Sequence, residues 1–239
     1  VSAGAGLAMT GLRPIVHTFN AFLVERAFEQ VKLDFSHQDV GGVLVGVGGS
    51  YDWPAGGRTH MGPGDVALLD TLPDWTIHVP GHADEAELLL RHAAAGTGRH
   101  YLRLTGHSND MTRPVGSGRL HVVRRGARAT VIAVGPVLDD VLSATRERDV
   151  TVLYATTVRP FDAPTLRAVL SGPDVVLVEP YLAGTSTRVV ADALHDVPHR
   201  TLALGVGDEL RRYGHPKEHQ REHGLDVAGL RSSIDAFLG

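Results

Sequence analysis

The clearest hydrophobic pattern of the chain lies between Arg13 and Phe35. Arg13 to Thr18 is short, apolar and β-prone, which predicts a buried strand. Ala21 to Phe35 then carries apolar residues at spacings of four, three and four, which predicts one buried face of an amphipathic helix. These apolar positions are Val24, Phe28, Val31 and Phe35.

Two aromatic residues stand at the junction between this strand and this helix, namely Phe19 and Phe22, with Asn20 between them. In open α/β sheets, ligands bind beyond the carboxyl ends of the strands. The two rings could therefore form a flat apolar slot for a ligand ring. The alternative is that both rings belong to the hydrophobic core.

Downstream, apolar strand-like runs alternate with helical patterns through the whole chain. Such alternation predicts mostly parallel sheets with helices on both faces. We therefore expect an α/β fold with two doubly wound sheets. The predicted strands are 43–47, 75–79, 101–104, 130–134, 151–155, 175–178 and 200–204, and the predicted helices are 1–9, 65–72, 83–95, 137–148, 163–170, 187–194 and 227–238.

The stretch 106–118 is rich in Gly, Ser, Asn, Asp and Pro and has no hydrophobic periodicity, which is typical of a linker. It divides the chain into a domain over 1–105 and a second over 119–239. The chain opens at Val1 in a run of small residues that looks like the middle of a helix. We therefore expect further residues before Val1 in the full protein.

Composition narrows the class of protein. A net charge of -4 with mixed signs favours neither nucleic acid nor a membrane surface as a partner. The absence of cysteine excludes disulfides, thiolate metal sites and a cysteine nucleophile, and it is compatible with the cytoplasm, where we expect the protein. No apolar run approaches the roughly 20 residues of a membrane span, and no signal peptide is evident.

Four stretches, in their order and spacing, resemble the transketolase superfamily over nearly the whole chain: Phe19 to Gln30, Gly57 to His60, Asp65 to Pro80 and Val178 to Leu194. The resemblance is to the pyrimidine-binding domain followed by the transketolase C-terminal domain. It implies a thiamine-diphosphate-binding fold for 1–105, with part of that domain preceding Val1, and the C-terminal fold for 119–239.

The resemblance implies thiamine diphosphate chemistry, in which the cofactor adds to a carbonyl and serves as an electron sink. By resemblance, Phe22 stacks on the pyrimidine ring, with Phe19 beside it. His60 faces the substrate carbonyl as a hydrogen-bond donor or proton shuttle. Arg58 and Arg26 are candidates to bind the substrate, although Arg26 is one residue out of register with the family.

Two parts of the family's machinery are not found in this sequence. By spacing, the catalytic glutamate falls just before Val1, and neither Glu25 nor Glu29 lies on the right segment. The Gly-Asp-Gly and Asn motif that binds the diphosphate and Mg2+ is absent, so no residue here is assigned to the metal. The resemblance then implies a partner subunit that holds most of the diphosphate and Mg2+, in a split enzyme with two of each subunit, a heterotetramer.

The candidate substrate site also departs from the sugar-phosphate enzymes of the family. Gly56 stands where they carry an aspartate, and Arg58 replaces a proline. Gly106 or His107 stands where they carry an arginine that grips phosphate. Because an arginine fork is the best phosphate ligand, its loss favours a smaller or unphosphorylated 2-keto donor. Arg58 could replace the lost charge.

A histidine trio recurs every four residues near the end of the chain, at His215, His219 and His223. On one helix face this spacing suits a metal. Pro216 disfavours a continuous helix through His215, and the segment is highly charged, so a subunit contact or surface loop is the preferred interpretation.

Three functions stay open at this point. The first is a transketolase-like subunit that transfers a two-carbon ketol or acyl unit between ketone and aldehyde substrates. The second is a beta subunit of a 2-oxo-acid dehydrogenase, which hands an acyl group to a lipoyl domain. The third is a non-catalytic partner that completes or regulates an assembly.

Overall fold

A computed structural model describes residues 1–115, 118–207 and 213–239; residues 116–117 of the predicted linker lie outside it. Its strands are β1 (Ile15–Phe19), β2 (Gly42–Val47), β3 (Trp75–His78), β4 (Arg99–Arg103), β5 (His121–Arg124), β6 (Ala129–Val134), β7 (Val150–Ala155), β8 (Thr157–Arg159), β9 (Asp174–Leu182) and β10 (Arg200–Val206). Its α-helices are α1 (Ser2–Met9), α2 (Phe28–Gln30), α3 (Asp65–Leu69), α4 (Ala83–Ala95), α5 (Leu138–Ala144), α6 (Ala163–Val169), α7 (Thr187–Ala193), α8 (Pro216–Glu222) and α9 (Val227–Leu238).

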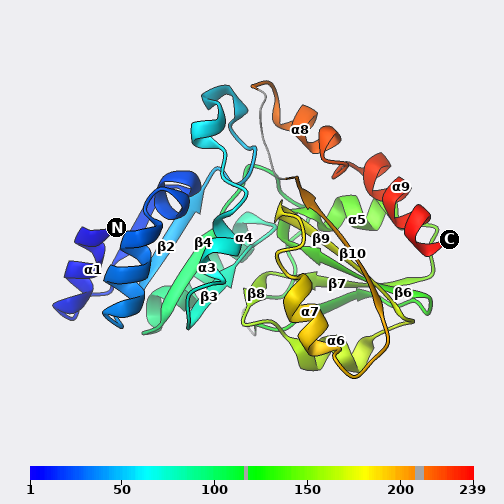
Figure 1. Cartoon of the computed structure of the whole chain (residues 1–239), viewed down its shortest axis with the longest axis horizontal. Helices are drawn as coiled ribbons and strands as arrows, with labels where there is room; N and C mark the ends of the chain where they lie inside the picture. The colour runs from blue at the N-terminus through cyan, green and yellow to red at the C-terminus, as the bar shows by residue number, and fades with distance from the viewer. Residues whose placement is uncertain (116–117, 208–212) are drawn as a thin grey trace.

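These strands form two five-stranded sheets side by side, with α1 at one end of the long axis and α9 at the other (Figure 1). The first sheet has the order β1-β2-β4-β3-β8 and the second the order β10-β9-β6-β7-β5. In each sheet four strands are parallel, whereas β8 and β5 run antiparallel to their neighbours. The predicted α/β class, with two mostly parallel sheets, is confirmed. Among the described helices, none is long and apolar enough to cross a membrane.

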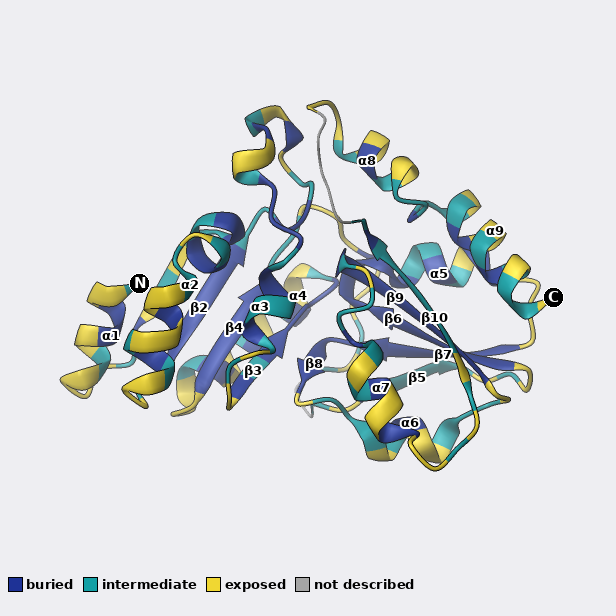
Figure 2. Cartoon of the chain, in the orientation of Figure 1, coloured by how far each residue is buried: buried dark blue, intermediate teal, exposed yellow. Residues whose placement is uncertain are grey.

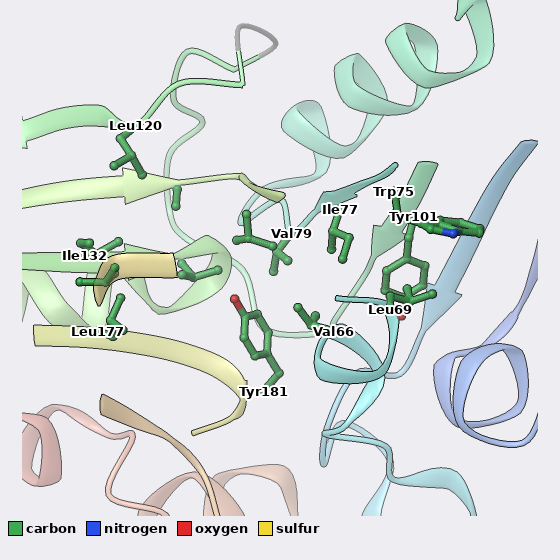
Figure 3. Packing of buried hydrophobic residues seen from close by; sticks show 14 of the residues in the cluster. Val66, Leu69, Trp75, Ile77, Val79, Tyr101, Leu120, Ile132, Leu177 and Tyr181 are labelled. Atoms are coloured by element: carbon green, nitrogen blue, oxygen red, sulfur yellow. The ribbon is translucent and has the colours of Figure 1, made fainter. Parts of the chain in front are cut away.

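The two sheets share one hydrophobic core. Its buried residues include Val66 of α3, Ile77 of the first sheet, and Ile132 and Leu177 of the second. Tyr181, at the end of β9, lies between Val66 and Leu177 in Figure 3 and is fully buried. Figure 2 shows the same arrangement, with buried strands at the centre and exposed residues on the outer helices.

Strand β8 was not predicted, and it ties the second half of the chain to the first sheet. Its residue Thr157 pairs with His78 of β3, and Arg159 pairs with Ile77. The Arg159 guanidinium also forms an ion pair with Asp70, just after α3. A three-residue strand carries too little periodicity to be recognised from sequence.

The predicted helix over 21–35 is present in a broken form. A π-helical turn spans Ala21–Glu25 and another spans Val31–His37, on either side of α2. The amide of Arg26 donates to the Ala21 carbonyl, five residues back, at 3.0 Å. A π turn accommodates one extra residue in a helix, so Arg26 lies one residue further along than in a regular α-helix.

The core face of that segment is nevertheless the predicted one. Val24, Val31 and Phe35 are completely buried, as their spacing indicates. Phe28, which follows the break after Glu25, is only half-buried. The sequence therefore predicted which of these residues are buried, but it did not predict the π-helical turns.

The segment 106–118 contains neither helix nor strand among its described residues and is hydrogen-bonded to both halves of the chain. The Asn109 side chain donates to the Gly135 carbonyl at 3.1 Å. The buried Glu85 carboxylate accepts the Arg113 amide at 2.8 Å. Its role as a linker, with domain boundaries near 105 and 119, stays a prediction.

Candidate functional site

Four aromatic rings meet at the carboxyl end of β1: Phe19, Phe22, Trp53 and His60. Phe19 is the last residue of β1, Phe22 lies on the first π turn, and Trp53 and His60 come from the loop after β2. The Phe19 and Phe22 ring centroids are 5.6 Å apart. Trp53 stacks on Phe19 at 5.2 Å and 18°. The predicted pair of aromatic rings is therefore part of a larger cluster.

The imidazole of His60 lies among the other three rings. Its centroid is 4.9 Å from Phe22, 4.8 Å from Trp53 and 5.6 Å from Phe19, in edge-to-face arrangements that aromatic rings prefer. Phe19, Phe22 and His60 are half-buried, whereas Trp53 is 44% exposed. The structure thus brings together the predicted catalytic residue and both predicted cofactor-binding residues, in a partly exposed cluster at the surface.

One nitrogen of the His60 ring is hydrogen-bonded within its own loop. Nδ1 lies 3.0 Å from the Gly56 carbonyl and 2.9 Å from the Thr59 hydroxyl. The carbonyl favours a proton on Nδ1, whereas the hydroxyl can donate to an unprotonated Nδ1. The two neighbours therefore support either tautomer, and with it a donor or an acceptor at Nε2.

The two arginines that we nominated for the substrate contact groups of the protein itself. The Arg26 guanidinium lies 4.3 Å from the centre of the Phe22 ring and donates to the Thr59 carbonyl at 2.8 Å. Arg58 donates to the Met61 carbonyl and lies 3.9 Å from the Glu25 carboxylate. Their predicted contact with substrate stays a prediction, and these contacts favour a role in positioning the ring cluster.

A fully buried polar network lies beneath the cluster and was not predicted. The Asp65 carboxylate accepts hydrogen bonds from Tyr101 at 2.6 Å, from Arg103 at 2.9 Å and from Asn20 at 3.2 Å. Arg103 also donates to the Ser50 hydroxyl at 2.6 Å. The network therefore joins the ends of β1 and β4, the start of α3 and the long loop.

The long loop after β2 is closed at its base and fixed to the second half of the chain. Ser50 and Gly62 exchange backbone hydrogen bonds of 3.3 and 3.1 Å. The Ser50 hydroxyl donates to the Pro180 carbonyl of β9 at 2.6 Å, and the Asn20 side chain donates to the Gly62 carbonyl at 2.7 Å. The loop that carries Trp53 and His60 is thus anchored on both sides.

The histidine trio lies against this loop. His215 precedes α8, His219 lies within it and His223 follows it. The rings of His219 and His223 both stack near Tyr51 of the loop, with centroids 5.8 Å away. The expected surface loop is wrong for His219, which is 2% exposed because it packs on Tyr51. Within the described residues, no group of three or more His, Cys, Asp or Glu could hold a metal ion.

The family described as transketolase, pyrimidine-binding domain, matches residues 1–121, just over half of the chain. The chain belongs to the transketolase superfamily. Residues 1–121 include all four rings of the cluster and the buried network beneath it.

Two related sequences align with the whole of this chain. A protein of Rhodococcoides fascians, described as an uncharacterized 33.6 kDa protein in the fasciation locus, is 51% identical over 244 residues, covering 100% of this chain and 78% of that protein. The 1-deoxy-D-xylulose-5-phosphate synthase of Thioalkalivibrio sulfidiphilus is 30% identical over 250 residues. This transketolase-superfamily chain spans only 38% of that synthase.

Two solved structures have the same fold. One is described as a split-gene transketolase, inactive beta4 tetramer, and it matches with a TM-score of 0.85 and 23% identity over 99% of this chain and 80% of that one. The other is a transketolase from Campylobacter jejuni, with a TM-score of 0.78 and 16% identity over 98% of this chain and 37% of that one. At these identities the likeness establishes the fold alone.

Membership of this superfamily implies thiamine diphosphate, and the site fits one half of that cofactor. A half-exposed Phe22 with a second ring beside it suits an aromatic heterocycle. The described residues supply no cluster that could hold Mg2+. Among the described residues, the ring cluster is the part that suits the cofactor, at its aminopyrimidine.

Sequence reasoning missed Trp53, Asp65 and Arg103 as parts of the site. A tryptophan in a glycine-rich loop after a strand was a visible signal for Trp53. The pairing of Asp65 with Arg103 leaves no signal in the sequence, because the two residues are 38 positions apart and come together only when the sheet forms.

Proposed function

We propose that this chain is one subunit of a thiamine-diphosphate-dependent, transketolase-like enzyme whose active site is shared with a partner chain. The observation that supports this most is the position of His60 between Phe19, Phe22 and Trp53 at the carboxyl end of β1. The reaction is transfer of a two-carbon ketol or acyl unit between a ketone and an aldehyde. When bound, the cofactor supplies an electron sink for the carbanion that this transfer requires.

Each residue has a distinct part in this proposal. Phe22 binds the aminopyrimidine face, and Phe19 completes the apolar wall. His60 presents Nε2 to the substrate oxygen and holds or delivers a proton there, while Gly56 and Thr59 orient its ring. Arg26 lies over Phe22 and holds Thr59, so it positions both rings.

The partner in this proposal is the diphosphate-binding subunit, which carries Mg2+, in a heterotetramer with two of each chain. The structural relative described as an inactive beta4 tetramer of a split-gene transketolase supports it, as an example of such a subunit without activity. A beta subunit of a 2-oxo-acid dehydrogenase and a non-catalytic assembly partner are the alternatives. The inactivity named in the description of that structure favours the non-catalytic assembly partner.

Co-purification and activity test the proposal. The full-length protein and the product of its neighbouring gene are mixed with thiamine diphosphate and Mg2+, and the mass of the assembly is measured by light scattering. We expect a two-plus-two assembly that transfers a ketol or acyl unit to an aldehyde, with neither chain active alone. An assembly that forms but transfers nothing establishes the non-catalytic alternative.

A further inference from the structure

The surface around His60 is aromatic, and its most exposed ring is Trp53. Trp53 stacks on Phe19 at 5.2 Å and meets the His60 imidazole at 4.8 Å, yet 44% of it stays exposed. The exposed part of the indole therefore lies next to His60, where it can contact the substituent of a carbonyl substrate. An indole face favours apolar and aromatic groups over strongly hydrated anions.

The three arginines nearest this surface already interact with groups of the protein. Arg26 bonds to Thr59 and lies over Phe22, as described above. Arg58 donates to the Met61 carbonyl and lies near the Glu25 carboxylate. Arg103 is completely buried in its ion pair with Asp65. A substrate phosphate cannot reach Arg103, and it would compete with the Thr59 and Met61 carbonyls and the Glu25 carboxylate for Arg26 and Arg58.

The loop also lacks room for a side chain at position 56, next to His60. A Cβ atom on Gly56 would lie 2.9 Å from Cγ of His60, closer than real Cβ atoms approach. The close packing of His60 on Gly56 thus leaves no room here for a side chain that could bind a polar substrate group, unless the imidazole moves. The nearby polar groups at Gly106 and His107 also face carboxylates of the protein: the Gly106 amide donates to Asp52, and His107 lies 3.5 Å from Asp140.

We propose that Trp53 is a specificity-determining residue that selects a carbonyl substrate with an unphosphorylated, apolar substituent, aromatic or branched alkyl. The indole covers one side of that substituent, and Phe19 supports the indole from behind. This proposal rests on the proposed function, because it places the substrate carbonyl at His60.

The test uses the full assembly, that is, the full-length protein with its partner subunit, thiamine diphosphate and Mg2+. Dissociation constants for benzaldehyde and for glyceraldehyde 3-phosphate are measured by calorimetry. We expect benzaldehyde to bind at least about tenfold more tightly than glyceraldehyde 3-phosphate. Trp53→Ala should weaken benzaldehyde about tenfold and change glyceraldehyde 3-phosphate less than about twofold, because a lost ring contact of about 1.4 kcal/mol is a factor of ten.

Two further variants control for general effects. Trp53→Phe keeps a ring beside Phe19 and should retain most of the affinity for benzaldehyde. Trp75→Phe alters the only other tryptophan, which is 5% exposed in the core, and should leave both probes unchanged. Light scattering on each variant reports whether the assembly is intact.

Several results overturn the inference. One is tighter binding of glyceraldehyde 3-phosphate than of benzaldehyde. Another is an equal loss of affinity for both probes in Trp53→Ala. The third is dissociation of the Trp53→Ala assembly, which would make Trp53 a subunit contact. Titration of thiamine diphosphate into the same samples separates the two proposals. Normal cofactor binding with any of these results overturns the specificity of Trp53 alone, whereas absent cofactor binding in wild type overturns the proposed function with it.

Discussion

His60 is the residue on which the proposed chemistry depends most. Its Nδ1 is engaged by Gly56 and Thr59, and its ring is enclosed on three sides, so its orientation is fixed before substrate arrives. A fixed imidazole whose second nitrogen faces a substrate oxygen is an efficient acid or base.

Replacement of His60 should therefore separate turnover from cofactor binding. We expect His60→Ala to lower kcat by roughly a hundredfold or more, because positioned proton transfer contributes that much. The affinity for thiamine diphosphate should change far less. Steady-state kinetics and calorimetry on the assembly measure the two, with His195→Ala as a control at an exposed histidine. Equal losses in turnover and affinity would contradict a substrate-facing role.

Phe22 should show the opposite pattern. We expect Phe22→Ala to weaken thiamine diphosphate about tenfold, because the ring contributes buried area and roughly 0.5–1.5 kcal/mol of stacking. Calorimetry on the assembly gives the dissociation constant, and Phe237→Ala serves as a control at a phenylalanine of α9. An unchanged affinity in Phe22→Ala would mean that the ring is only part of the core.

At the scale of elements, the Asp65–Arg103 pair couples α3 to β4 beneath the site. Both side chains are 0% exposed, and breaking a buried pair leaves one charge uncompensated. We expect Asp65→Ala to lower the free energy of unfolding by about 3–5 kcal/mol. Urea denaturation measures this loss.

An exposed ion pair on α4 gives the matched control for that experiment. Glu87 and Arg91 lie 2.8 Å apart, and more than half of each side chain is exposed. Glu87→Ala should change the free energy of unfolding by no more than about 0.5 kcal/mol, because such pairs are screened by solvent. Similar losses of unfolding free energy in Asp65→Ala and Glu87→Ala would mean that the buried pair stabilises the fold no more than an exposed pair does.

The elements that sequence predicted well are those with long and regular apolar patterns. The strand at 43–47 and the helix at 83–95 are confirmed as β2 and α4. Short or irregular elements were missed: β5, β8 and α8. The π turn at 21–25 was not foreseen either, since an inserted residue leaves the apolar face almost unchanged.

The candidate site was predictable only where a short motif resembles the family. Phe19, Phe22 and His60 were named in this way, and the structure brings them together, although their roles stay predictions. Trp53 joins them because the long loop folds back onto β1. Tertiary contacts of this kind leave no periodic signal in the sequence.

At the scale of the whole molecule, the contact between the two halves should be sensitive to acid. His78 of β3 bonds Thr157 of β8 at 3.0 Å and lies 3.2 Å from Nδ1 of His100. Burial, together with the neighbouring His100 and His92, lowers the pKa of His78 to about 3. The charged imidazolium is therefore strongly disfavoured at this contact between β3 and β8.

The sign of the resulting pH dependence follows from proton uptake. Above pH 6.5 the His78 ring is neutral in both states and contributes nothing. As the pH falls below about 6.5 the unfolded chain binds a proton first, so stability falls until the pH nears 3. At pH 5 the loss from His78 should reach about 2 kcal/mol.

A comparison of His78→Gln with wild type isolates this effect. Glu179 acts in the opposite sense, because burial raises its pKa to about 7 and the folded state then takes up a proton between pH 7 and 4.5. Glu179 is present in both proteins, so its contribution drops out when the free energies of unfolding of His78→Gln and wild type are subtracted. Urea denaturation should show that the variant gains stability relative to wild type as the pH falls from 7 to 5. A constant difference would show that His78 does not titrate as described.

The central claim is that this chain supplies the aminopyrimidine half of a thiamine diphosphate site and that a partner supplies the rest. Calorimetric titration of thiamine diphosphate with Mg2+ tests it most directly, first on the full-length protein alone and then on its mixture with the product of the neighbouring gene. We predict binding in the mixture only, and weaker binding when the mixture contains Phe22→Ala. Binding by the full-length protein alone would contradict a shared site, and no binding in either sample would contradict a catalytic role.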